Sequence, residues 1–433
     1  MQTIKLNIEY FIYFLIISQL WISSIYSFTP PGISGHSTAL IDKTLYFIGG
    51  DVSPSSFSLS LNRSFDVSNP SFGVYPSYTS AFVEQAAPLV GIKGGTSCVG
   101  GSKNDTIFVF GGENWYGRTK NYIMEKLINK FDITNQEWSS PEIGDEPTRR
   151  QDIQAVIDTK GNMYMFGGKW NRTDYYSDMI IFNTITSTYS FGSTIDGPTC
   201  MFGYTATLLP SGIIVYIGGR FWDDSIPINI ATLPTTPITN IALYDINNDS
   251  WSSTIANIKS YIQDRSYHSA VLVSDGRIIC YGGISSNGTT VSPSLIILNI
   301  KTSPFEWRSQ IYSGDNEPPG LYAHSANLFE NYMIIGFGEK SNDYISSITT
   351  TSTSTDIYMF DVGNNTWISK YRTNTDSEPE SDPDSITKSV NKSIAISVGL
   401  TVAFIIVFML IGCFCGKRIR TTYVVRYRYR TNI

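Results

Sequence analysis

The chain has 433 residues, a formal net charge of −6, 42% hydrophobic residues and 13% aromatic residues. An acidic chain lacks the basic face that phosphate groups require, so its charge argues against nucleic acid and other anionic polymers as partners. Five cysteines are few for an exported fold held by disulfides, and a chain of this length can bury a sufficient core without them.

Residues 1–27 have the composition of an export signal. They begin with Lys5, continue through an apolar stretch and end in small residues around Ser27. This order is typical of a secretory signal peptide cleaved after Ser27. An uncleaved signal anchor is the alternative, because Ile25 is not a preferred residue at the −3 position.

Residues 28–370 contain a pattern that recurs six times. Each unit opens with a short strand whose third residue is small, and a hydrophobic strand that ends in a diglycine follows. The opening strands begin at His36, Thr96, Ile153, Tyr204, His268 and His324, and their third residues are Thr38, Cys98, Ala155, Ala206, Ala270 and Ala326. The diglycines are residues 49–50, 111–112, 167–168, 218–219 and 282–283, with Gly336-Phe337-Gly338 in the sixth unit. A repeat of about 50 residues with such strands is typical of a propeller blade, because inner strands crowd near the axis.

Each unit closes with a turn residue and an aromatic residue. The third strands are expected to end at Asp66, Asp132, Asn183, Asp245, Asn299 and Asp361. The aromatic residues that follow are Phe72, Trp138, Tyr189, Trp251, Trp307 and Trp367. The acid or amide predicts an Asx turn, and the ring is expected to fill space between twisted sheets. The expected fold class is therefore all-β, a six-bladed β-propeller.

This order of strands resembles the kelch repeat, and the resemblance covers about residues 34–370. The chain is similar to single-pass membrane kelch proteins of fungi, which often carry the label of the galactose oxidase central domain. The resemblance implies a kelch-type propeller. Such propellers mostly serve as interaction platforms, and a few relatives are enzymes, so the fold alone does not decide the function.

The C-terminal part of the chain predicts a membrane anchor. Residues 371–392 form an acidic stalk rich in Ser, Thr and Pro, and residues 393–415 contain no charge and are long enough to cross a bilayer as one helix. The tail, residues 416–433, has six basic residues and no acid. By the positive-inside rule the chain is a type I single-pass protein of the plasma membrane, with the propeller extracellular and the tail cytoplasmic.

Glycosylation sequons agree with an extracellular placement. The candidate acceptors are Asn62, Asn104, Asn171, Asn248, Asn287 and Asn364. Most of them fall between the expected strands, where a bulky glycan is tolerated.

The candidate ligand-binding residues lie in two sets of loops. The set after the diglycines supplies Trp115, Trp170, Arg220, Trp222 and Asp223, and the set between the repeats supplies Arg150 and Arg265. In an antiparallel four-stranded blade both sets emerge on one face. Trp with Arg and carboxylate is typical of a binding hot spot, and flat rings also stack on sugars. Alternatively, each Trp covers the edge of its own blade, and the similar offsets of Arg150 and Arg265 before an opening strand fit a structural role.

The sequence argues against catalysis. His36, His268 and His324 occupy one repeat column, whereas a copper site needs unlike residues that converge. We therefore expect these histidines to be structural, with no metal ligand set, no cofactor and no catalytic motif. The sequence predicts a non-enzymatic cell-surface propeller that binds an extracellular protein or glycan. A carbohydrate oxidase like galactose oxidase is the alternative.

Overall fold

The computed structural model describes residues 30–51, 56–60, 65–66, 82–84, 92–114, 126–144, 146–170, 173–222, 233–314, 316–340, 352–368 and 370–371. The chain divides into two units, Met1–Thr373 and Asn374–Ile433, and every described residue belongs to the first. The described ranges hold no helix that is long and apolar enough to span a membrane. The signal peptide predicted at residues 1–27 and the membrane helix predicted at residues 393–415 lie outside these ranges.

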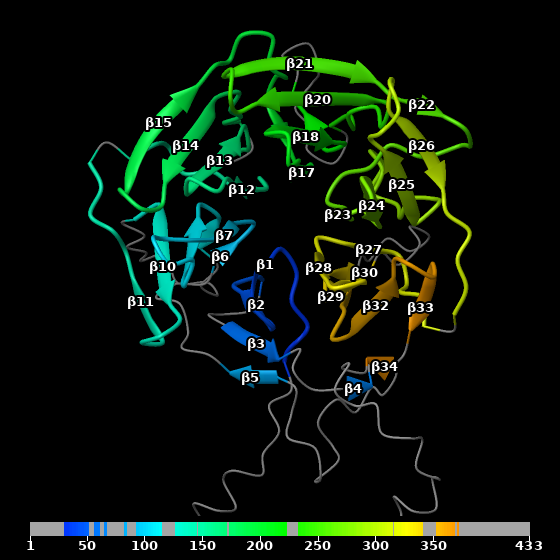
Figure 1. The fold of residues 1–433 in the computed structure, drawn as a ribbon, viewed down its shortest axis with the longest axis horizontal. Coiled ribbons are helices and arrows are strands. Elements are labelled where there is room, and N and C mark those ends of the chain that lie inside the picture. The colour runs from blue at the N-terminus through cyan, green and yellow to red at the C-terminus, as the bar shows by residue number, and fades with distance from the viewer. Residues whose placement is uncertain are drawn as a thin grey trace, which may run out of the picture. The chain divides into compact units, whose positions relative to one another are not determined.

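Antiparallel sheets of four or five strands arranged around a common centre form the first unit (Figure 1). The first sheet has the order β1 (Ser37–Ile41), β2 (Thr44–Ile48), β3 (Ser56–Ser60) and β5 (Phe82–Glu84). The second has β7 (Thr96–Gly100), β8 (Thr106–Phe110), β10 (Ile128–Asp132) and β11 (Glu137–Ser139). The third has β12 (Val156–Ile157), β13 (Asn162–Phe166), β14 (Met179–Asn183) and β15 (Thr188–Gly192).

The remaining large sheets repeat this order. The next has β17 (Thr205–Leu208), β18 (Ile213–Ile217), β20 (Asn240–Asp245) and β21 (Ser250–Ile255). It is followed by β23 (Ser269–Leu272), β24 (Arg277–Tyr281), β25 (Leu295–Asn299) and β26 (Glu306–Ser309), with β22 (Asn257–Ile258) added in parallel to β26. The last has β28 (Ser325–Phe329), β29 (Tyr332–Gly336), β32 (Ile357–Asp361) and β33 (Thr366–Ile368).

The second strand of each sheet forms the core. β2, β8, β13, β18, β24 and β29 share one burial pattern, in which only the first residue is partly exposed. A strand buried on both faces is continuously hydrophobic instead of alternating. Two of the aromatic rings predicted to fill space between sheets show such packing directly: Trp251 of β21 packs against Phe166 of β13 with ring centroids 4.6 Å apart, and Trp367 of β33 packs against Tyr281 of β24 at 5.4 Å.

The innermost strands contact one another in the order β1, β7, β12, β17, β23 and β28, and β28 contacts β1 in turn. A circle of backbone hydrogen bonds runs just before these strands. Each N–H donates to the carbonyl of the equivalent residue in the preceding sheet over 2.7–2.9 Å, and the participants are Gly35, Gly94, Asp152, Gly203, Tyr267 and Ala323. The circle closes where Gly35 donates to Ala323 over 2.9 Å. All six residues have positive φ, between 51° and 70°, which is a glycine conformation that Asp152, Tyr267 and Ala323 adopt as well.

Other short strands join neighbouring segments. They are β6 (Ile92–Lys93) with β9 (Glu113–Asn114), β16 (Met201–Phe202) with β19 (Arg220–Phe221), β27 (Leu321–Tyr322) with β30 (Glu339–Lys340) and β31 (Ser352–Thr353), and β34 (Lys370–Tyr371) with β4 (Phe65–Asp66). The pair of β34 and β4 connects the end of the repeats to the first repeat.

The structure corrects two details of the sequence pattern. In the second repeat the positive-φ residue is Gly94, so the residue equivalent to Thr38 is Ser97, and Cys98 lies in the buried core instead. In the first repeat the third strand is β3 and ends at Ser60, whereas Asp66 belongs to β4. Phe72 lies outside the described residues.

The Asx turns are confirmed in the later repeats. The Oδ1 of Asp132 accepts the backbone N–H groups of Thr134 and Asn135 over 2.8 and 2.9 Å. The same turn forms at Asn183, Asp245, Asn299 and Asp361. The side-chain oxygen thus fixes the hairpin between the third and fourth strands.

Candidate functional site

The two sets of loops expected on one face are paired with each other. Segments between repeats bond to segments that follow a diglycine, as in β6 with β9, β16 with β19, and β27 with β30. Isolated bridges join Gln151 to Lys169 and Ser266 to Ile284 in the same way. This confirms the expected grouping of the loops, and we call the surface that they form the loop face.

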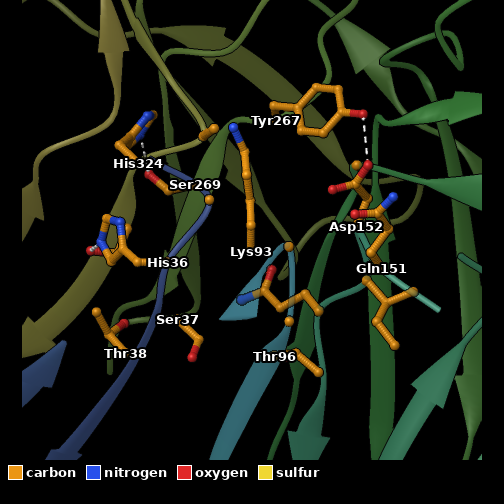
Figure 2. Close-up of a pocket in the computed structure, with 18 of the residues that line it drawn as sticks. His36, Ser37, Thr38, Lys93, Thr96, Gln151, Asp152, Tyr267, Ser269 and His324 are labelled. Atoms are coloured by element: carbon orange, nitrogen blue, oxygen red, sulfur yellow. Dashed lines mark hydrogen bonds between the residues drawn. The ribbon is translucent and has the colours of Figure 1, made fainter. Parts of the chain in front are cut away.

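A cavity of about 450 Å³ opens on the loop face at the centre of the sheets. Its wall contains the positive-φ circle and the first residues of the inner strands, including Ser37, Thr38, Thr96, Ser97 and Ser269. Residues that follow a diglycine, Glu113, Lys169 and Glu339, line it as well. Figure 2 shows that Lys93, Gln151, Asp152 and Tyr267 lie around the same space. The cavity therefore has charged groups from the loops and hydroxyl groups from the strands.

One group of polar residues at the rim consists of Asp152, Lys169 and Tyr267. The Nζ of Lys169 lies 2.9 Å from Oδ2 of Asp152. The hydroxyl of Tyr267 donates to the same oxygen over 3.0 Å (Figure 2). Burial and the neighbouring Asp152 raise the pKa of Tyr267 well above its usual value, so the hydroxyl stays protonated and donates.

A second group at the rim consists of Lys93, Tyr322 and Glu339. The hydroxyl of Tyr322 donates to Oε2 of Glu339, and Ser34 Oγ lies 2.7 Å from Oε1. Lys93 Nζ lies 3.7 Å from Oε1. Both groups thus combine a lysine, a carboxylate and a tyrosine hydroxyl.

The three histidines lie beneath the rim and connect neighbouring sheets. Nε2 of His36 lies 2.9 Å from Ser325 Oγ, and Nε2 of His324 lies 2.7 Å from Ser269 Oγ. Nε2 of His268 lies 3.1 Å from Thr205 Oγ1. Burial lowers the pKa of His36 and of His324 to about 3 and that of His268 well below its usual value, so all three rings are neutral near pH 7. In the described part of the chain no group of three His, Cys, Asp or Glu residues could hold a metal ion.

The candidate arginines are buried and donate to main-chain carbonyls. Arg150 donates to Gly167 O over 3.2 Å and forms an ion pair of 2.5 Å with Asp178. Arg265 donates to Gly282 O over 3.1 Å and also to the carbonyls of residues 293 and 294. In both cases the glycine acceptor lies seventeen residues after the arginine in the sequence.

The guanidinium of Arg220 donates to the carbonyls of Leu233 and Ser285 and to the hydroxyl of Ser266. All three arginines therefore brace the loop face from within. Arg150 and Arg265 therefore have the structural role that was the alternative to ligand binding, and Arg220 has the same role.

The candidate Trp222 lies in an aromatic group that sequence reasoning did not assemble. Its ring stacks on Tyr175 at 4.9 Å with an interplanar angle of 3°, and Tyr175 contacts Phe202 at 5.6 Å. Lys169 Nζ lies 4.8 Å above the ring of Phe202, which joins this group to Asp152 at the cavity rim. We call Tyr175, Phe202 and Trp222 the aromatic group of the loop face.

Other candidates lie near this group or outside the described residues. Trp170 is partly buried, and its backbone N–H donates to Asp174 O over 2.9 Å. Trp115 and Asp223 lie outside the described residues.

The rim residues carried a weak signal in the sequence. Asp152 and Tyr267 occupy the same repeat position, directly before an opening strand, and Lys169 and Glu339 both follow a diglycine motif. A comparison of these two repeat positions would have predicted that the four side chains lie at the same end of the central cavity.

The described glycosylation candidates divide between two kinds of turn. Asn104 lies between β7 and β8, and Asn248 and Asn364 occupy equivalent hairpins in which Nδ2 donates to Asp245 and Asp361 over 2.7 Å. These turns connect strand ends opposite those that lead to the loop face. Asn287 follows a diglycine and lies with the loop face, and Asn62 and Asn171 are outside the described residues.

The family model described as the Attractin/LZTR1 beta-propeller matches residues 107–401, which is more than half of the chain. The chain belongs to this family of kelch-type propellers. It is 24% identical over 257 residues to the putative protein tag-53 of Caenorhabditis elegans, a match that covers 55% of this chain and 17% of that protein. The chain therefore spans less than a fifth of that relative's length.

The solved structure of YjhT supports the fold. It resembles this family member with a TM-score of 0.57 at 13% identity, over 80% of this chain and 99% of the other. At this identity the likeness concerns the fold alone. Kelch propellers commonly serve as protein-interaction scaffolds, and membership of the Attractin/LZTR1 family agrees with that use.

Proposed function

We propose that this chain is a non-enzymatic cell-surface propeller that binds an extracellular protein or glycan on its loop face. The observation that supports this function best is the series of contacts from Trp222 through Tyr175, the buried Phe202 and Lys169 to Asp152, which links a stacked aromatic pair to the rim of the central cavity. Stacked aromatic rings beside a lysine and a carboxylate combine apolar area with directional polar groups, as binding hot spots do.

The propeller in this proposal has six blades. The closed circle of six backbone hydrogen bonds supports this number, because each of its members precedes the inner strand of one large sheet. The contact between β28 and β1 supports closure without a strand exchanged between the first and last blades.

The membrane arrangement of the proposal rests on the ends of the sequence. A signal peptide at residues 1–27, one helix at residues 393–415 and the basic tail make the chain a type I plasma-membrane protein of the kind found in fungi. The proposal includes glycans at Asn248 and Asn364, on turns away from the loop face. An endoglycosidase should then increase the gel mobility of the full chain, and the Asn248→Gln and Asn364→Gln variants should each show a smaller shift. An unaltered wild-type mobility would contradict this arrangement.

Family membership and the use of the histidines favour binding over catalysis. Each imidazole is buried, neutral and hydrogen-bonded to the hydroxyl of a neighbouring sheet, which gives it a structural role. Peroxide release from sugars by the purified chain, together with stoichiometric copper, would instead establish the carbohydrate oxidase.

The binding function is tested by removal of the aromatic pair. The full chain is applied to an array of glycans and extracellular proteins, beside a Tyr175→Ala/Trp222→Ala variant and a Phe191→Ala control. Phe191 is an aromatic residue with 60% exposure on the outer strand β15, away from the loop face. We expect the double variant to lose about 30-fold or more in affinity for the array ligand, which is the range of hot-spot residues. Equal capture by all three proteins would refute the proposed surface.

A further inference from the structure

We infer that the central cavity binds a primary ammonium group, and that the carboxylate of Glu339 receives it. The ligand class is a small alkylamine or the lysine side chain of a protein. This inference deepens the proposed function, because it assigns a chemistry to the cavity beside the aromatic group.

The carboxylate of Glu339 is held in place by neutral hydroxyl groups, and its ammonium partner is not in close contact. The side chain is only 15% exposed; the hydroxyl of Tyr322 donates to Oε2, and Ser34 Oγ lies 2.7 Å from Oε1 and 2.9 Å from Oδ2 of Asp51, between which its single hydrogen is shared. Lys93 Nζ lies 3.7 Å from Oε1, which is longer than a charge-assisted hydrogen bond of 2.7–2.9 Å. An ammonium that approached to that distance would gain a stronger interaction than Lys93 supplies.

The same rim shows what a close ammonium contact requires. At Asp152, the ammonium of Lys169 lies 2.9 Å from the carboxylate, Tyr267 donates to the same oxygen, and the Lys169 side chain is 14% exposed. The face of Phe202 supplies a cation–π contact on another side of that ammonium. Glu339 and Tyr322 repeat the pair of carboxylate and tyrosine with the cation farther away. Among the described residues of the cavity rim there is thus one carboxylate with a close ammonium contact, Asp152, and one whose ammonium contact is longer, Glu339.

The surroundings of the cavity also favour a cation. The histidines beneath the rim are neutral, and the guanidinium groups of Arg150, Arg220 and Arg265 are directed to backbone carbonyls. The described charged residues of the wall are Lys93, Glu113, Asp152, Lys169 and Glu339, so carboxylates outnumber ammonium groups. In a partly desolvated cavity this imbalance attracts a positive group more strongly than it does in open water.

The test measures binding of n-butylamine to the full-length chain by calorimetry, with n-butanol as the neutral probe of similar size. We expect millimolar binding of the amine and weaker binding of the alcohol. The Glu339→Gln variant should bind the amine about tenfold more weakly. The Lys93→Met variant should bind it severalfold more tightly, because the internal ammonium no longer competes, and a merely structural carboxylate would not produce this gain.

The matched control is Glu306→Gln, whose carboxylate pairs with Lys259 on the outer strands at 2.8 Å and lies away from the cavity. It should leave amine binding unchanged. Equal binding of amine and alcohol, or equal effects of Glu339→Gln and Glu306→Gln, would overturn the inference. If Glu339→Gln fails to fold, Lys93→Met decides, and unchanged or weaker amine binding by that variant is a negative result.

N-acetyl-lysine amide serves as a second probe that distinguishes the source of the ammonium. Equal binding of both probes supports a small amine as ligand, and tighter binding of the lysine derivative supports a protein side chain. Array capture that depends on Tyr175 and Trp222 would survive a negative amine result, so failure of this inference is separable from failure of the proposed function.

Discussion

The buried histidines should make the propeller lose stability in mild acid. Burial lowers the pKa of His36 and His324 to about 3 from 6.5, whereas both titrate near 6.5 in the unfolded chain. Between these values the unfolded state binds one more proton per histidine than the native state. The free energy of unfolding therefore decreases as pH falls below 6.5, by about 1.4 kcal/mol per pH unit and per histidine.

The magnitude follows from the same pKa values. Between pH 7 and pH 5 each of these two histidines removes about 2 kcal/mol from the free energy of unfolding. His268, whose pKa is lowered by burial and by Arg265, adds a third contribution of the same sign. The sum for His36 and His324 is about 4 kcal/mol, which is a large part of the stability of an ordinary domain, and His268 increases it.

The assay is urea unfolding of the full chain at pH 7, 6 and 5, followed by fluorescence of the buried Trp251, Trp307 and Trp367. A His324→Gln variant should be less stable at pH 7, because it loses the contact of the imidazole with Tyr281. Its stability should nevertheless depend less steeply on pH than that of the wild type, by about one proton. A wild-type stability that does not change between pH 7 and pH 5, or an unchanged slope in the variant, would refute the reasoning.

Three further predictions concern the braces and the core, each measured by the same unfolding assay at pH 7. Arg265→Met should lower the free energy of unfolding by about 2–4 kcal/mol, because it leaves buried carbonyls without donors. The control Arg308→Met, on the exposed side of β26, should lower it by less than about 0.5 kcal/mol. Gly203→Ala should lower the free energy of unfolding by about 1–2 kcal/mol, because φ is 63° there and a Cβ would lie 3.3 Å from the ring of Tyr267. The control Gly144→Ala should leave the free energy of unfolding nearly unchanged, because no atom lies within 4 Å of the added Cβ. Trp307→Ala should cost about 3–5 kcal/mol, since the indole is fully buried and donates to Ile238 O, and a cost below about 1 kcal/mol would contradict its place in the core.

The β-propeller fold was predictable because the same pattern of strands and turns recurs along the sequence. Hydrophobic strands before each diglycine are buried on both faces, and the turn at Asp132 and its equivalents follows directly from the side chain. The first repeat was harder, because Asp66 and Phe72 imitate the pattern while the third strand ends earlier, at Ser60. Side-chain type alone could not show that Asp66 pairs instead with the far end of the repeats.

The candidate site was predictable as a face and not as a set of contacts. Arginine beside tryptophan looks the same in sequence whether the guanidinium meets a ligand or a carbonyl, and burial of Arg265 decides between these roles. Tyr175 and Trp222 are far enough apart in sequence that only the pairing of β16 with β19 and the loops around it brings their rings together. The rim pair of Tyr322 and Glu339 depends in the same way on β27 and β30.

The circle of hydrogen bonds before the inner strands uses main-chain atoms alone, and its junction between Gly35 and Ala323 has the same form as its other junctions. The main-chain hydrogen bonds of the circle therefore do not distinguish the junction at which the chain begins from the other junctions. New ends opened at an exposed hairpin, such as the turn after Asp245, with residues 30 and 371 joined by a flexible linker, should give a permuted chain that assembles the same propeller. Evolution can likewise change the side chains at Asp152, Tyr267 and Ala323 without altering the bonds that hold the blades together.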